Sequence, residues 1–100
     1  MRLAHLTFTV RPDVQHEALG VLLEEVPAVR DMAGCVAFIP FIDPTVTGGI
    51  GVLHEWATEA DFAAYLASET FAASGARLFP LMTREPDSRR FEAEPVAPAA

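Results

Sequence analysis

The sequence predicts an α+β protein of the ferredoxin-like, split βαβ class: a four-stranded antiparallel sheet with helices on one face. Three observations lead to this prediction. Strand-like and helix-like segments follow one another in the order β-α-β-β-α-(α)-β. The chain has 100 residues, which is enough for one small domain. Apolar residues make up 51% of it, which is sufficient for a core and argues against disorder.

The first strand and the first helix are expected before residue 34. Residues 2–11 are rich in β-branched and aromatic side chains, which is typical of a strand. Alternation gives this strand one wholly apolar face, made of Ala4, Leu6, Phe8 and Val10. Pro12 and Asp13 then favour a helix start. An apolar stripe at helical spacing follows: Val14, Ala18, Val21 and Leu22. We expect Pro27 to interrupt this helix or to begin a short last turn.

The second and third strands are expected on either side of a loop that contains Pro44 and Gly48. Residues 34–43 form a segment with two apolar faces, so both faces should be covered. Pro40 lacks a backbone donor, which indicates an edge strand or a bulge. Residues 48–57 form the third strand, which ends near Trp56.

The last third of the chain predicts two helices and a final strand. Thr58 and Asp61 have the spacing of a capping box, and the helix that follows carries Phe62, Tyr65 and Leu66 on one face. Ser68 can cap another helix, and residues 88–96 alternate as a fourth strand. We therefore expect a single domain over residues 1–94 and a disordered tail over residues 95–100.

The predicted sheet has apolar side chains on both faces, although the helices can cover only one. Leu3, Ile39 and Phe41 fall on the face opposite the helices. A bare apolar sheet face favours aggregation. The simplest way to cover it is a second copy of the chain, so we expect a twofold homodimer that packs sheet on sheet.

Composition excludes several classes of function. The formal net charge is −7 and the sequence has no basic run, so neither nucleic acid nor an anionic membrane surface is an expected partner. No apolar stretch approaches the ~20 residues that span a bilayer, and the N-terminus does not have the pattern of a signal peptide. The single cysteine, Cys35, cannot form an internal disulfide, which fits a cytoplasmic location. Neither a metal-ligand cluster nor a phosphate-binding glycine loop is present, so we expect no metal and no cofactor.

Several short motifs occur in a fixed order along nearly the whole chain. The first strand ends near Arg11-Pro12, and the pattern GC-x-x-F-x-P-x-I-D follows over residues 34–43. Trp56 ends the third strand, the next helix reads Phe-Ala-Ala-Tyr-Leu, and Ser68, Phe71 and a Leu-x-Pro-Leu run come after it. In this order and spacing the chain resembles the antibiotic biosynthesis monooxygenase domain family, which are small dimeric α/β-barrel proteins.

The resemblance implies a cofactor-independent oxygenase, because relatives of this kind convert anthrones or hydroquinones to quinones. The family also includes haem-degrading enzymes and members of unknown activity. Its members often have Glu two residues before the Trp and His in the second helix, where this chain has His54 and Tyr65. Haem-degrading members use an Asn on strand one and a His on the last helix. The matching positions here are His5 and Gly75, which argues against haem.

Cofactor-free oxygenation sets simple demands on a site. Triplet O₂ reacts poorly with closed-shell molecules, but an electron-rich phenolate can give it one electron. The protein must supply a flat apolar pocket, a group that takes a proton and a donor that holds the anion. The candidate catalytic residues are His54, His5 and Arg77: two imidazoles that titrate near neutral pH and a cation for the oxyanion. The candidate substrate-binding residues are Trp56, Tyr65, Phe62 and Phe41.

These assignments depend on geometry. His54 shares a strand face with Trp56, whereas His5 joins them only in the register that the family suggests. Core packing explains Trp56 equally well, because burying its ring contributes roughly 4–6 kcal/mol. Hydrogen-bonded burial explains either histidine, and a surface charge explains Arg77.

The predicted function is therefore a small cofactor-independent monooxygenase that acts on a phenolic, anthrone or hydroquinone-type aromatic in secondary metabolism. Two alternatives remain open. One is a cyclase or isomerase of an aromatic polyketide-type intermediate, which also needs only acid and base groups. The other is a homodimer that binds a small molecule without catalysis. The fold cannot choose among them.

Overall fold

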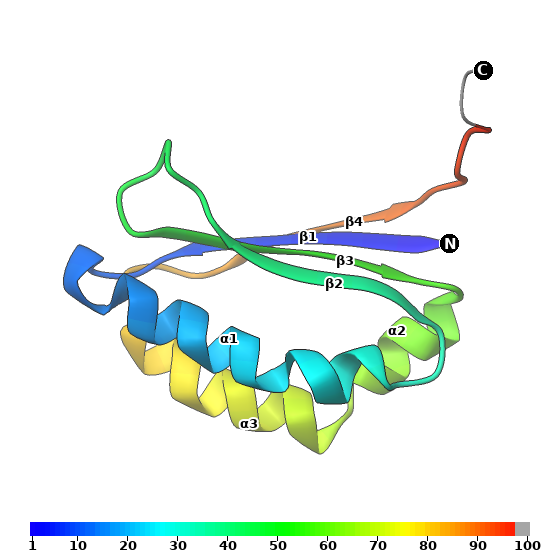
Figure 1. The fold of residues 1–100 in the computed structure, drawn as a ribbon, viewed down its shortest axis with the longest axis horizontal. Coiled ribbons are helices and arrows are strands. Elements are labelled where there is room, and N and C mark those ends of the chain that lie inside the picture. Colours follow the sequence, from blue (N-terminus) through cyan, green and yellow to red (C-terminus); the bar gives the residue numbers. More distant parts are fainter. Residues whose placement is uncertain (98–100) are drawn as a thin grey trace.

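The structure, a computed structural model that describes residues 1–97, has one antiparallel sheet with helices on a single face (Figure 1). The strands are β1 (Arg2–Thr9), β2 (Cys35–Ile42), β3 (Gly49–Trp56) and β4 (Asp87–Glu92). They lie in the order β2-β3-β1-β4. The predicted ferredoxin-like α+β fold is confirmed, and Pro40 lies on an edge strand as its missing donor requires.

Three α-helices form the second layer of the described chain: α1 (Gln15–Arg30), α2 (Glu59–Leu66) and α3 (Glu69–Leu78). Short 3₁₀ segments flank them, η1 (Pro12–Val14) and η2 (Phe79–Leu81). The predicted caps are present. The Thr58 hydroxyl accepts a bond from the Asp61 N–H at 3.1 Å, and the Ser68 hydroxyl accepts one from the Phe71 N–H at 3.1 Å. No helix among the described residues is both long and apolar enough to cross a membrane.

Helix α1 continues through Pro27 without a break, and its last turn begins there, which is the second of the two outcomes expected for this proline. The helix runs to Arg30, and the Asp31 N–H bonds to the Pro27 carbonyl at 3.2 Å, so the ladder resumes after the proline. The missing N–H of Pro27 would have bonded to the carbonyl of Leu23. Leu23 is exposed, so the lost hydrogen bond falls on the solvent side of the helix.

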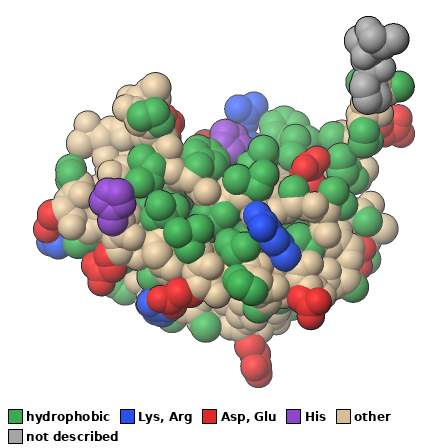
Figure 2. All heavy atoms as spheres, viewed as in Figure 1, with side chains coloured by type: hydrophobic (Ala, Val, Ile, Leu, Met, Phe, Trp, Pro, Cys, Tyr) green, Lys and Arg blue, Asp and Glu red, His purple; other side chains and the backbone are tan. Residues whose placement is uncertain are grey.

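The core lies between the sheet and the helices. Ala4 and Phe38 pair with His54 from the two strands beside β3, so all three side chains share the helix-side face. The largest fully buried side chains there are those of Trp56, Phe38, Ile50, Val29 and Val52. Acidic side chains are scattered along the helical layer, and apolar side chains occupy the middle of the same view (Figure 2).

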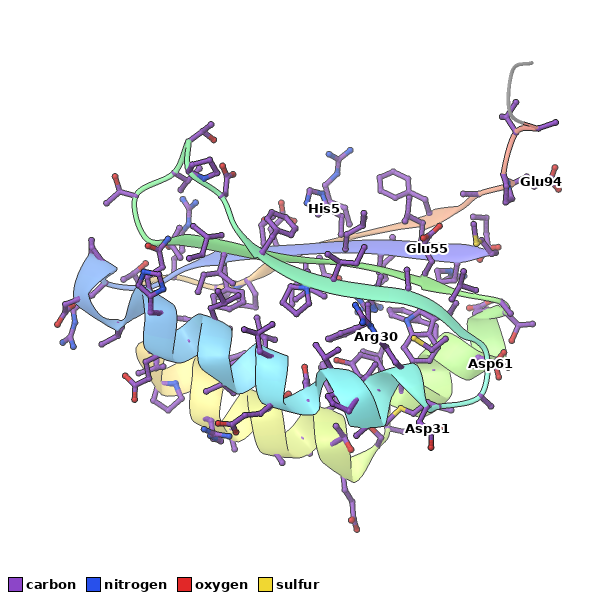
Figure 3. The ribbon with its side chains drawn as sticks, in the orientation of Figure 1. His5, Arg30, Asp31, Glu55, Asp61 and Glu94 are labelled. Carbon is purple, nitrogen blue, oxygen red and sulfur yellow. The ribbon has the colours of Figure 1, made fainter. Side chains whose placement is uncertain are left out.

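The opposite face of the sheet is open. Ile39 and Phe91 are 46% and 42% exposed on it, and His5 lies on the same side, away from the helices (Figure 3). The Phe41 ring lies across Gly51, where a Cβ would come within 2.3 Å of the ring. Of the expected tail, residues 95–97 have no helix or strand, and residues 98–100 lie outside the described part.

Candidate active site

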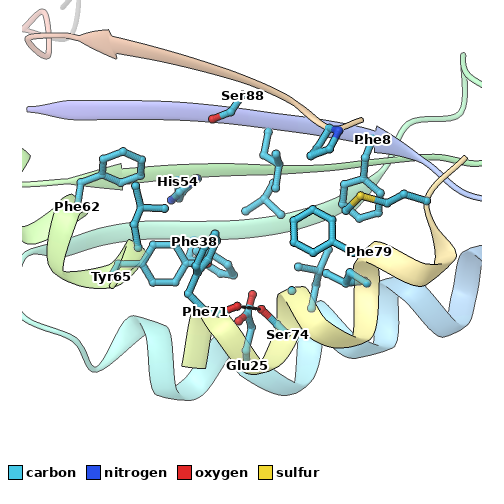
Figure 4. Close-up of a pocket in the computed structure, with 18 of the residues that line it drawn as sticks. Phe8, Glu25, Phe38, His54, Phe62, Tyr65, Phe71, Ser74, Phe79 and Ser88 are labelled. Atoms are coloured by element: carbon cyan, nitrogen blue, oxygen red, sulfur yellow. Dashed lines mark hydrogen bonds between the residues drawn. The ribbon is translucent and has the colours of Figure 1, made fainter. Parts of the chain in front are cut away.

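A pocket of about 190 Å³ opens between the sheet and the helices. Its wall is made of residues from all four strands and from α1, α2 and α3 (Figure 4). The aromatic lining side chains are Phe8, Phe38, Phe62, Tyr65, Phe71 and Phe79. The polar ones are Glu25, His54, Ser74, Ser88 and Arg90. An apolar pocket with a few polar groups is the usual form of a small-molecule site.

His54 reaches the pocket from β3 and is held in one tautomer. The Trp56 indole N–H donates to its Nδ1 at 2.9 Å. Because the indole can only donate, Nδ1 must carry a lone pair, and the proton of the neutral imidazole is on Nε2. Burial, together with the smaller effect of the nearby Arg90 charge, lowers the pKa of His54 to about 4. At neutral pH His54 is therefore an uncharged donor.

Aromatic rings surround this imidazole. The rings of Phe38 and Phe62 have their centroids 5.5 Å from that of His54, and Tyr65 lies at 5.7 Å. Tyr65 also stacks on Trp56 at 5.1 Å. Burial raises the pKa of Tyr65, with smaller effects from Glu25 and Cys35, so its hydroxyl stays protonated. These contacts restrict the orientation of the histidine ring.

Glu25 is a buried carboxyl on the helix side of the pocket. It is 7% exposed, and its Oε2 atom is buried without a hydrogen-bond partner. Burial raises its pKa to about 7, and the Ser74 side chain partly offsets this effect. Figure 4 shows Glu25 and Ser74 on the helical side, with His54 and Ser88 on the sheet side of the same pocket.

The cation at the pocket is Arg90 on β4. It pairs with Ala4 in the sheet, which directs its side chain to the helix-side face. Its guanidinium lies 5.1 Å from the centroid of the Phe62 ring, and Arg2 lies 5.8 Å from the same ring. Within residues 1–97 Arg90 forms no salt bridge, so its charge is free to act at the pocket mouth.

Two residues expected at the site lie elsewhere. His5 pairs with Leu53 in the sheet, one position out of phase with His54, and its ring stacks on Phe41 at 6.1 Å. Both side chains therefore lie on the open face. The expectation that His5 faces the helix-side pocket is wrong, and Phe41, a candidate substrate-binding residue, lies away from that pocket on the face where alternation puts it. The physical reason is strand alternation, which sends neighbouring side chains to opposite faces.

The expected places of Arg77 and Trp56 also need correction. Arg77 is half-exposed on α3 and forms an ion pair with Glu24 at 2.5 Å, so it does not line the pocket. Trp56 is fully buried and is absent from the pocket wall. It acts through its hydrogen bond to His54 and through core packing, whereas Tyr65 and Phe62 lie on the wall as expected.

Sequence reasoning missed Glu25 and Arg90. The buried positions of α1 are Ala18, Val21, Leu22, Glu25 and Val29, which is one helical stripe. The acidic residue in that stripe was the available signal. Arg90 lies on β4, a short strand whose residues are all exposed, so no burial pattern in the sequence separates its two faces. Only the pairing of Arg90 with Ala4 of β1 shows that its side chain is on the helix side.

Among residues 1–97, no three His, Cys, Asp or Glu side chains lie together in a way that could hold a metal ion. A comparison with curated proteins finds no match.

Solved structures share the fold at low identity. A Deinococcus radiodurans protein named for an antibiotic biosynthesis monooxygenase is 18% identical, with a TM-score of 0.89 over 100% of this chain and 99% of that one. A Caulobacter crescentus protein with the same kind of name is 23% identical, with a TM-score of 0.88 over 94% of this chain and 90% of that one. Rv0793 from Mycobacterium tuberculosis is 16% identical, with a TM-score of 0.84 over 98% of this chain and 100% of that one.

Residues 1–77 match the family described as antibiotic biosynthesis monooxygenase. This match spans most of the chain and includes β1 to β3, α1, α2 and most of α3. The chain belongs to the antibiotic biosynthesis monooxygenase family.

Proposed function

We propose that the protein is a cofactor-independent monooxygenase that oxidises a small phenolic aromatic in the pocket between the sheet and the helices. The observation that carries this proposal is the pocket itself: an aromatic-lined cavity whose wall includes His54, protonated on Nε2, and the buried carboxyl of Glu25. Family membership supports the same reaction class. A role in secondary metabolism is part of the proposal.

The size of the cavity favours a substrate with one ring inside the pocket. A dry cavity of roughly 150 Å³ holds a benzene molecule in another protein. At about 190 Å³, this pocket accommodates one substituted ring, and a larger anthrone-type molecule would extend through the mouth. Facing rings from Phe38, Phe62 and Tyr65 would contact such a ring edge-on or face-on.

The reaction needs the chain to stabilise an anion. Loss of the phenolic proton gives an electron-rich phenolate, which passes one electron to O₂. The radicals then combine, and the peroxide breaks down so that one oxygen atom enters the ring and the other leaves in water. The overall balance is phenol plus O₂ to quinone plus water. The Nε2–H of His54 and the charge of Arg90 stabilise the phenolate while it forms.

The open sheet face supports a homodimer as part of this proposal. Ile39, Phe41, Leu53 and Phe91 lie on it, and two copies packed sheet on sheet would remove these side chains from water. Covering most of that face requires an interface larger than ~1,200 Å² in total.

The test is oxygen consumption by the purified protein with single-ring phenols and hydroquinones, without added flavin, haem or metal. We expect one O₂ consumed for each molecule of quinone formed, and no turnover under nitrogen. Turnover under nitrogen would instead indicate a cyclase or isomerase. Saturable binding of the phenols with neither reaction would indicate a non-catalytic binding protein.

A further inference from the structure

One buried group of the pocket has no partner inside the protein. The Glu25 side chain is more than nine-tenths buried, lines the cavity, and has an Oε2 atom that accepts no hydrogen bond. A buried polar atom without a partner is destabilising, typically by about 1–3 kcal/mol in mutational series. All the buried positions of α1 except Glu25 are occupied by hydrophobic residues. The carboxyl therefore lacks a structural explanation within the described chain.

His54 is poorly suited to remove the substrate proton. Its Nδ1 lone pair is already engaged by the Trp56 N–H at 2.9 Å, and its Nε2 carries a proton. The group has no free lone pair to offer to a phenol in this arrangement. The general base, expected to be His54, must therefore be another group in the pocket.

We propose that Glu25 takes the proton from the phenolic substrate, while His54 donates its Nε2–H to a substrate oxygen. The inference rests on the proposed function, since it assigns roles within the same pocket. In the step, the phenolic O–H bond breaks, its electron pair stays on the substrate oxygen, and the proton forms a new O–H bond on the Glu25 carboxylate. Glu25 then becomes a neutral acid, and the single negative charge moves to the phenolate.

The surroundings of Glu25 suit this transfer. The titratable or charged side chains that line the pocket with it are Tyr65 from α2, His54 from β3 and Arg90 from β4, and Ser74 faces it from α3. Arg77, also on α3, is bonded to Glu24 outside the pocket. A base whose pKa lies near the operating pH is efficient, and burial brings the pKa of Glu25 to about 7.

The first experiment measures kcat/KM for 1,4-hydroquinone by oxygen uptake across a pH series. For the wild-type protein we expect the rate to rise with pH up to about 7, as the Glu25 carboxyl ionises. Glu25→Gln keeps the shape but cannot take a proton, so we expect a loss of roughly 10²- to 10⁴-fold together with loss of that limb. Glu24→Gln is the matched control. The Glu24 carboxylate is next to Glu25 in the sequence but is exposed and lies outside the pocket, so this variant should keep the wild-type rate and pH dependence.

The second experiment does not depend on turnover. The carboxyl carbon of Glu25 is followed by ¹³C NMR through a pH titration and is assigned by its absence in Glu25→Gln. The probe is 4-nitrophenol, a single-ring phenol whose ionisation is visible as a yellow colour. We expect bound 4-nitrophenol to shift the Glu25 resonance and its titration midpoint, and to leave the Glu24 resonance unchanged. Circular dichroism checks that each variant is folded.

The outcomes separate the two levels of the account. If 4-nitrophenol shifts the Glu25 resonance and no phenol consumes O₂, the proposed function fails and the contact between Glu25 and the phenol stands. If the wild-type protein oxidises hydroquinone and folded Glu25→Gln keeps its rate and pH profile, the role of Glu25 is overturned and the oxygenase stands. Binding of 4-nitrophenol that leaves the Glu25 resonance unmoved also overturns it.

Discussion

Burial of Glu25 should make the stability of the protein depend on pH in a specific window. In the folded state the pKa of Glu25 is about 7, compared with 4.5 for an ordinary glutamate. Between these values the folded chain keeps a proton that the unfolded chain releases. The contribution of Glu25 to the free energy of unfolding therefore falls as the pH rises from about 4.5 to about 7, and it is constant above that.

The size of the effect follows from the two pKa values. At about 1.4 kcal/mol for each tenfold change in proton affinity, the difference corresponds to roughly 3 kcal/mol. Water at the pocket mouth screens part of this, so we expect a change of about 2 kcal/mol. His54 acts in the opposite direction. Its pKa in the folded state is about 4, below the ordinary value of 6.5. The contribution of His54 to the free energy of unfolding therefore increases as the pH rises from about 4 to 6.5.

The assay must therefore compare variants rather than read the wild-type curve alone. Urea unfolding is measured for the wild-type protein and for Glu25→Gln from about pH 5 to about pH 8. We expect Glu25→Gln to gain about 2 kcal/mol relative to the wild type across this range, because His54 is the same in both proteins. Glu24→Gln should show no such gain. A constant difference between wild type and Glu25→Gln would refute the burial argument.

Four further changes have distinct expected results. His54→Ala should lower turnover by roughly 10²- to 10³-fold through loss of a hydrogen-bond donor to the anion, whereas His16→Ala on the surface of α1 should leave the rate unchanged; equal rates in both would contradict the role of His54. Trp56→Phe should destabilise the protein by about 1–3 kcal/mol in thermal or urea unfolding, because it removes buried area and the bond to His54. It should also raise the pKa of His54 measured by NMR, and an unchanged His54 spectrum would count against that bond. Ile39→Asp, on the open sheet face, should convert a dimer to a monomer in light scattering at micromolar concentration, and a wild-type protein that is already monomeric would refute the dimer.

The fold could be predicted from the sequence because its local signals agree with one another. The caps at Thr58 and Ser68, the alternation in β1 and the edge position of Pro40 are each short-range patterns with a physical cause. At Pro27 the sequence left two outcomes open, an interruption of the helix and a short last turn, and the structure has the second. Whether a proline ends a helix depends on whether the carbonyl four residues earlier can reach water, and that depends on tertiary structure.

The site was only partly predictable. His54 was placed correctly on the helix side because it lies two residues from Trp56 on the same strand, so no register was needed. For His5 the two sources disagree: alternation in β1 puts it opposite the apolar face of Ala4, Leu6 and Phe8, whereas the register implied by the family resemblance puts it with His54. The structure follows the alternation. Arg90 could not be found because it depends on the pairing of β4 with β1, a long-range contact with no local signal.

The most direct test of the central claim, that this pocket oxygenates a phenol without an added cofactor, is isotope labelling with ¹⁸O₂. Purified wild-type protein is incubated with 1,4-hydroquinone under ¹⁸O₂, and the quinone product is analysed by mass spectrometry. The account predicts 2-hydroxy-1,4-benzoquinone with one ¹⁸O atom in each molecule, the second atom being released as labelled water, and much slower formation of this product by Glu25→Gln and His54→Ala. A product that forms without ¹⁸O, or that forms equally fast under nitrogen, would contradict it.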